Sequence, residues 1–172
     1  MEPPEYVYHT TFLQNLGGIA SEGLQPSTRA QFGGYARHSL GRVFVSDFDG
    51  VSLWASRMES VGMGESDLRT DADVADWMPI VLRIGDSVAF EFDPLGHCDS
   101  GWCGPWYVEN RIGPEHIEVW DGREWVMVED ADISAMRQRA LDSASFESEE
   151  TDEYGEDGWW EADFDALLPP GP

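Results

Sequence analysis

Five short segments between residues 79 and 128 have the composition of β-strands, and they constrain the fold more than any other feature. Each is rich in β-branched or aromatic residues and is separated from the next by turn residues; they are 79–84, 87–92, 106–108, 117–120 and 124–128. This pattern predicts a mostly antiparallel β half in the second part of the chain.

The first forty residues predict a strand, a turn and a helix. Glu5–Thr10 alternates polar and apolar residues, as a short strand does, and Leu13–Glu22 carries its apolar residues at helical spacing. Gly23 follows directly and is the residue expected where a helix stops. Residues 25–41 show no periodicity and contain Pro26, Gly33, Gly34 and Gly41, so we expect a long loop that binds a ligand.

The remaining segments predict helices beside the β half. Arg42–Ser46 has the composition of a short buried strand, and Asp49 can cap a helix that runs to Gly62. We expect residues 63–77 to be irregular because they are polar, and residues 131–140 to form a last helix after Asp130. The whole pattern is typical of an α+β protein, with early helices packed on an antiparallel sheet.

Charge divides the chain into two parts. The 172 residues carry a formal net charge of −24, and residues 142–172 hold 11 of the 34 acids and no cation. We therefore predict a domain over 1–141 and an acidic extension over 142–172. Four apolar residues of the extension have the spacing of a helix face, which would dock on the domain itself or on a basic partner: Trp160, Phe164, Leu167 and Leu168.

Composition excludes several classes of function. The negative field repels phosphate backbones, so a nucleic acid is a disfavoured partner. No apolar run is long enough to span a bilayer and the N-terminus lacks a signal pattern, so we expect a cytoplasmic protein, acting in its own cell or in a target cell. Cys98 and Cys103 with His97 give too few ligands at the wrong spacing for a structural zinc site, so no metal is expected.

Two motifs resemble a known family. The first is Y-H-T-T at residues 8–11, followed by a helix that begins N-L at 15–16, closes at G-L-Q-P-S over 23–27, and leads to G-R-V-F-V-S over 41–46. The second is W-Y-V-E-N-R-I-G-P-E-H-I over 106–117. In this order the motifs resemble the ADP-ribosyltransferase fold over about residues 6–120. The resemblance is closest to the branch of the RNA 2′-phosphotransferases and the DNA-targeting ADP-ribosyltransferase toxins.

The resemblance implies a split β core with a cleft for NAD, which is the substrate that supplies ADP-ribose. His9 would bind the ribose of NAD, and Asn15 would lie near the adenosine. The nicotinamide ribose would be bordered by Thr10, Thr11, Gly23 and Leu24. Arg37 or Arg42 would face the pyrophosphate, because a guanidinium binds two phosphates bidentately; the competing interpretation is that Arg42 pairs with Asp47 or Asp49.

The catalytic carboxylate is the point at which the sequence departs from the family. The toxins carry a glutamate where this chain has Pro105, and Glu109, directly after the predicted strand over 106–108, is the nearest acid. Four positions keep the same strand face but move the side chain by roughly 13 Å. We expect an NAD-dependent mono-ADP-ribosyltransferase of toxin, effector or phage-encoded type, with Glu109 as its acid and a protein or small polar acceptor. The alternative is an inactive protein of this fold whose acidic surface binds a basic protein.

Overall fold

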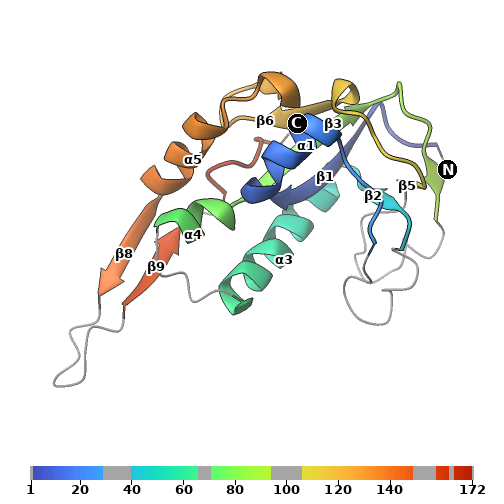
Figure 1. Ribbon diagram of the computed structural model, residues 1–172. Coiled ribbons are helices and arrows are strands. Elements are labelled where there is room, and N and C mark those ends of the chain that lie inside the picture. The colour runs from blue at the N-terminus through green and yellow to red at the C-terminus, as the bar shows by residue number, and fades with distance from the viewer. Residues whose placement is uncertain are drawn as a thin grey trace.

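Two antiparallel sheets meet where the first strand pairs with the second (Figure 1). The computed structural model describes residues 2–28, 40–65, 71–93, 106–148, 158–162 and 165–171. Over these residues the protein combines antiparallel sheets with helices, which confirms the predicted α+β class.

The larger sheet has four strands in the order β1-β3-β6-β7. Their bounds are β1 (Tyr6–Phe12), β3 (Pro79–Gly85), β6 (Ile117–Trp120) and β7 (Trp125–Met127). β1 and β3 pair along their whole lengths, from Tyr6 opposite Gly85 to Phe12 opposite Pro79. The alternate residues Ile80, Leu82 and Ile84 of β3 are fully buried, so this strand is central to the hydrophobic core.

One charged residue interrupts the apolar sequence of β3. Nε of Arg83 donates a hydrogen bond of 2.8 Å to an oxygen of Glu118, and Nη2 of Arg83 lies 2.8 Å from the same oxygen. Its Cζ atom lies 4.5 Å from the ring centroids of both Tyr6 and Trp125. The ion pair and the two rings explain how a cation is accommodated within a β-strand of this kind.

The smaller sheet has three strands in the order β2-β5-β4. Their bounds are β2 (Val43–Val45), β5 (Trp106–Val108) and β4 (Glu91–Phe92). Tyr8 on β1 and Ser46, just after β2, exchange two backbone hydrogen bonds of 2.8 Å, which join the two sheets. β4 is shorter than the strand predicted over 87–92, because residues 86–88 form the turn that leaves β3.

Helices and 3₁₀ turns pack around the sheets. η1 (Leu13–Asn15) and α1 (Leu16–Glu22) follow β1 directly, so the predicted helix over 13–22 is confirmed with a 3₁₀ first turn. α3 (Asp49–Glu65) packs on β1 and β3, and α4 (Asp71–Asp76) packs on α5 (Ile133–Asp142). The short turns η3 (Pro114–His116) and η4 (Val128–Asp130) flank β6 and β7.

Three predictions about helix boundaries are wrong. Much of the 63–77 segment is helical rather than irregular, because burial of Val74 and Ala75 against the core stabilises α4. Asp49 is the first residue of α3, and the cap is Asp47, whose carboxylate accepts from the Gly50 N–H at 3.1 Å. The last helix begins at Ile133 rather than after Asp130.

The acidic C-terminal segment contains a hairpin and a buried anchor. β8 (Ala144–Ser148) pairs with β9 (Gly158–Ala162), and Figure 1 shows this hairpin extending from the end of α5 away from the sheets. The predicted helix face through Trp160 is therefore wrong, because residues 158–162 pair as a strand. Leu167 is fully buried in the core. The boundary predicted between residues 141 and 142 falls inside α5.

No helix in the described part of the chain is both long and apolar enough to cross a membrane.

Candidate functional site

His9 lies on β1 beside the junction of the two sheets. Its Nδ1 atom is 2.8 Å from the backbone carbonyl oxygen of Phe44 on β2. Burial lowers the pKa of His9 below its usual value, against the opposing effect of this hydrogen bond. A carbonyl oxygen only accepts, so the neutral ring carries its proton on Nδ1 and keeps an acceptor lone pair on Nε2.

Two of the polar residues that follow His9 are hydrogen-bonded to each other. Thr11 is buried, and its hydroxyl oxygen accepts from the Asn15 amide at 3.0 Å. Thr10 is 6% exposed, and its hydroxyl has no hydrogen-bond partner among the described residues. Of the four residues predicted here, the structure joins Thr11 and Asn15, whereas His9 and Thr10 are neighbours on β1 and lie on opposite faces of the strand.

Gly23 and Leu24 lie against the segment after β5. Leu24 and Ile112 exchange two backbone hydrogen bonds of 3.0 Å. Gly23 has a φ of +75°, and a Cβ atom at this position would lie 2.0 Å from the Ile112 carbonyl oxygen. A glycine is therefore required here, and the backbone polar groups of Leu24 already have partners.

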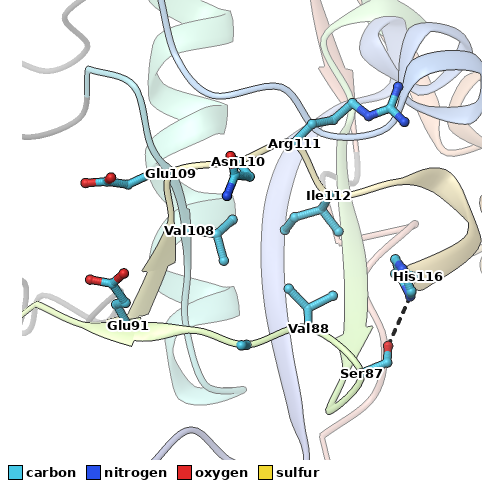
Figure 2. Close-up of a pocket in the computed structure, with 10 residues that line it drawn as sticks. Ser87, Val88, Glu91, Val108, Glu109, Asn110, Arg111, Ile112 and His116 are labelled. Carbon is cyan, nitrogen blue, oxygen red and sulfur yellow. Dashed lines mark hydrogen bonds between the residues drawn. The ribbon is translucent and has the colours of Figure 1, made fainter.

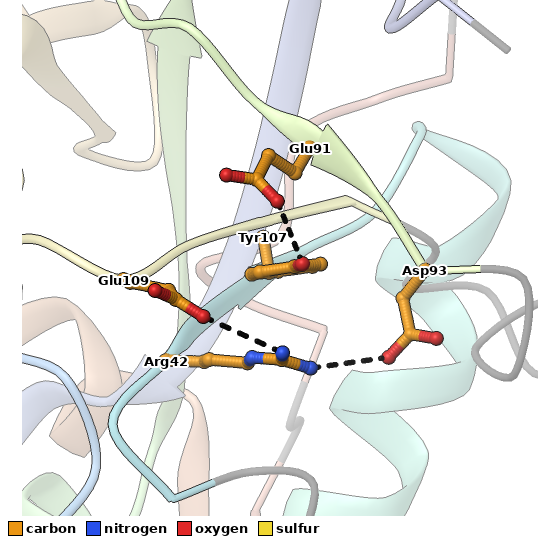
Figure 3. A network of polar contacts seen from close by, with 5 residues as sticks. All are labelled: Arg42, Glu91, Asp93, Tyr107 and Glu109. Carbon is orange, nitrogen blue, oxygen red and sulfur yellow. Dashed lines mark hydrogen bonds and ion pairs between the residues drawn. The ribbon is translucent and has the colours of Figure 1, made fainter.

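Arg42 lies at the centre of a polar network on the smaller sheet (Figure 3). Its Cζ atom is 4.0 Å from the centroid of the Tyr107 ring, so the guanidinium stacks on the aromatic face. Nη1 is 3.7 Å from an oxygen of Asp93, and Nη2 is 3.4 Å from an oxygen of Glu109. The predicted partners Asp47 and Asp49 are wrong, because β2 pairs with β5 and brings Arg42 beside Tyr107 instead.

Glu91 completes the network from the other side of β5. The Tyr107 hydroxyl donates to a Glu91 oxygen at 2.8 Å, and this hydrogen bond is the main cause that raises the pKa of Tyr107. Glu91 and Tyr107 are opposite each other in the β4–β5 register. Two of the three carboxylates therefore contact Arg42 directly, and the third holds the ring beneath it.

A pocket of about 380 Å³ opens between the β3–β4 connection and the segment that follows β5 (Figure 2). Glu91 and Glu109 lie at one end of the pocket, and Ser87 and His116 lie at the other. Between them the pocket is lined by further residues: Val88, Ala89, Val108, Asn110, Arg111 and Ile112. Figure 2 shows the guanidinium of Arg111 turned away from the space between Val88 and Val108.

The structure separates the predicted site residues into two groups. Glu109 pairs with Arg42, and no hydrogen bond or ion pair joins Glu109 to His9 in the described part of the chain. Arg37, Pro105 and both cysteines lie outside the described residues. Sequence reasoning missed the roles of Asp93, Glu91 and Tyr107, although Glu91 and Asp93 alternate with the apolar Phe92 and so share one strand face.

Comparison of the chain with models of known protein families, with curated proteins and with solved structures finds no match.

Proposed function

We propose that this protein is an NAD-dependent mono-ADP-ribosyltransferase that modifies a protein or a small polar acceptor. The observation that carries the proposal is the hydrogen bond from His9 to the Phe44 carbonyl oxygen at the junction of the sheets. It fixes a neutral imidazole with an accepting Nε2, which is the form that binds a ribose hydroxyl. Two sheets joined through Tyr8 and Ser46 also agree with the split β core that the sequence resemblance implies.

Transfer of ADP-ribose requires stabilisation of a cationic ribose. The glycosidic bond to nicotinamide breaks before the acceptor is fully bonded, so the ribose carbon develops oxocarbenium character. A carboxylate aimed at this carbon stabilises the developing charge. Glu109 supplies this carboxylate in the proposal, since its side chain is 63% exposed and lies at the rim of the pocket.

Arg42 is the described residue that would bind the pyrophosphate of NAD. Its contacts with Asp93 and Glu109 are at 3.7 and 3.4 Å, which are longer than a strong charge-assisted hydrogen bond. A phosphate oxygen can replace the exposed Glu109 while the guanidinium stays stacked on Tyr107. NAD binding would thus release Glu109 from Arg42.

The first test measures NAD binding and nicotinamide release by the purified full-length protein. We expect heat of binding in calorimetry and release of nicotinamide during incubation. His9→Ala should weaken NAD binding by about 1–3 kcal/mol, because a ribose hydroxyl loses its partner. Gln14→Ala, an exposed change in η1, is the matched control and should bind NAD normally. A native protein that gives no heat with NAD contradicts the proposal.

The second test addresses the acid. Glu109→Gln keeps the shape of the side chain but removes its charge, so turnover should fall by on the order of 10²–10³. NAD affinity should not fall, because the substitution removes a competitor for Arg42. Glu129→Gln on η4 is the control for loss of one negative charge. Full turnover in Glu109→Gln would show that another residue supplies the carboxylate.

A second candidate is a protein of this fold that binds a basic protein without catalysis. The two ion pairs of Arg42 favour it, because they already neutralise the cation that NAD would need. The net charge of −24 provides long-range attraction for a basic partner. In this case NAD gives no heat and no nicotinamide, while a lysine-rich peptide binds with an affinity that decreases as salt increases.

A further inference from the structure

Ser87 and His116 form a hydrogen-bonded pair at the end of the pocket opposite Glu109 (Figure 2). The Ser87 hydroxyl oxygen is 3.1 Å from Nδ1 of His116. Ile84 of β3 is paired with Ile117 of β6, so the turn after β3 and the end of η3 lie at the same edge of the sheet. The pairing of these strands therefore places a hydroxyl and an imidazole together at the pocket.

Glu115 lies on the far side of the imidazole. One oxygen of its carboxylate is 3.6 Å from Nε2 of His116. The Glu115 carboxylate packs against Gly113: a Cβ atom at residue 113 would lie 2.3 Å from the oxygen that faces His116. In the tautomer with its proton on Nε2, His116 can accept the proton of Ser87 at Nδ1, and the imidazolium so formed lies 3.6 Å from the Glu115 carboxylate, close enough for an ion pair. Nucleophile, base and carboxylate follow one another as in serine hydrolases, but with the ring nitrogens exchanged, since Nδ1 faces the serine and Nε2 faces the carboxylate.

The rest of the pocket defines which substrates fit. Figure 2 shows Val88 and Ile112 beside the Ser87–His116 pair, so an acyl chain has an apolar surface to contact. Glu91 and Glu109 stand at the other end, and they repel an anionic substrate. The volume of about 380 Å³ is in the range of small-molecule sites. A small ester without negative charge satisfies all three conditions.

We propose that Ser87 is a nucleophile that accepts the acyl group of small, uncharged or cationic esters. Ser87 Oγ attacks the carbonyl carbon and its proton passes to Nδ1 of His116. The ester C–O bond then breaks and the alcohol leaves with that proton. Water attacks the acyl-serine in the same way, which releases the carboxylic acid and returns the proton to Ser87 Oγ. This activity does not rest on the transferase proposed above.

The test uses p-nitrophenyl acetate with the full-length protein. We expect release of p-nitrophenol and transfer of acetyl to the chain, located at Ser87 by mass spectrometry of peptides. The chain has no lysine, so acetylation of side-chain amines cannot obscure the result. An otherwise similar ester with a carboxylate on its acyl group should react more slowly. Acetyl groups on other residues and none on Ser87 would overturn the proposal.

Variants separate chemistry from folding. Ser87→Ala should abolish acetylation, and His116→Gln should slow it by about 10²–10⁴ because the base is lost. Glu115→Gln should lower the maximal rate without changing the ester concentration that gives half of it, as expected for a positioning residue. Ser21→Ala is the control, since this hydroxyl donates to Gly18 within α1.

Circular dichroism melts accompany each variant. If Ser87→Ala fails to fold, the acetylation rate of His116→Gln tests the mechanism, because this variant retains the nucleophile and changes only the base. Unchanged acetylation at Ser87 in His116→Gln contradicts the mechanism. NAD consumption should be the same in Ser87→Ala as in the native protein, so failure of this proposal and failure of the transferase are distinguishable.

Discussion

His9 couples the stability of the protein to pH. Burial holds its pKa below 6.5, so the unfolded chain takes up a proton at a higher pH than the folded chain does. Above this value the residue is neutral in both states and makes no pH-dependent contribution. As the pH falls below it, the unfolded state gains a proton that the folded state does not, and the free energy of unfolding decreases.

We therefore expect the native protein to lose more stability than His9→Gln between about pH 7.5 and about pH 5.5. The measurement is urea unfolding of both proteins at the two pH values. Carboxylates elsewhere in the chain affect both proteins equally, so the difference isolates His9. Equal losses would show that the imidazole is protonated as readily in the folded state as in the unfolded one.

Two glycines at the first helix provide a matched pair of substitutions. Gly23→Ala places a methyl group 2.0 Å from the Ile112 carbonyl oxygen and forces alanine to a φ of +75°. We expect a loss of at least about 2 kcal/mol, because backbone strain adds to the clash. Gly18→Ala in α1 meets nothing within 4 Å and should stabilise the protein by about 0.5–1 kcal/mol. Thermal melts of both variants check the prediction, and similar effects of the two substitutions contradict it.

At the scale of elements, substitutions at the start of α5 test whether Asp132 or Asp130 caps the helix. The Asp132 carboxylate accepts from the Ala135 N–H at 3.0 Å, whereas Asp130 precedes the helix in η4. Asp132→Ala should cost about 1 kcal/mol of stability, and Asp130→Ala should be close to neutral. Chemical unfolding of the two variants measures the difference. A larger loss for Asp130→Ala would support the helix start that the sequence predicts.

The boundaries of several elements depend on their neighbours. The polar composition of residues 63–77 predicts an irregular segment, but α4 is helical because Val74 and Ala75 pack into the core. Aromatic residues at helical spacing similarly indicated a helix through Trp160, but the backbone there pairs with β8. A short segment forms whichever structure satisfies its backbone in the context of its neighbours, so its own pattern is a weak guide.

At the scale of the whole molecule, Leu167 ties the acidic segment to the domain. Its side chain is fully buried and lies near Gly122, in the turn between β6 and β7. Leu167→Ala should therefore destabilise the protein by about 2–5 kcal/mol, as expected for a truncated core leucine. Leu168→Ala, at a partly buried neighbour, should cost clearly less.

Removal of residues 163–172 should destabilise the protein at least as much as Leu167→Ala does. Urea unfolding of the shortened chain measures this loss. A shortened chain as stable as the full one would mean that the acidic segment is a separate extension, as its composition predicts.

The α+β class, the strand–helix opening and most of the strands follow from the sequence alone. Periods of two and near 3.6 residues, with glycine at the helix stop, indicate which side chains of a segment face the core, so these elements can be predicted from local sequence. The contact between Thr11 and Asn15 is equally local, since the two residues are four positions apart in the chain.

Tertiary structure alone decided which distant residues meet. Arg42 pairs with Asp93 and Glu109 because β2, β5 and β4 are adjacent in one sheet, and the sequence carries no signal for that order. Ser87 reaches His116 only through the pairing of β3 with β6. Leu167 enters the core although its segment is the most acidic in the chain, because burial of one apolar side chain outweighs the composition around it.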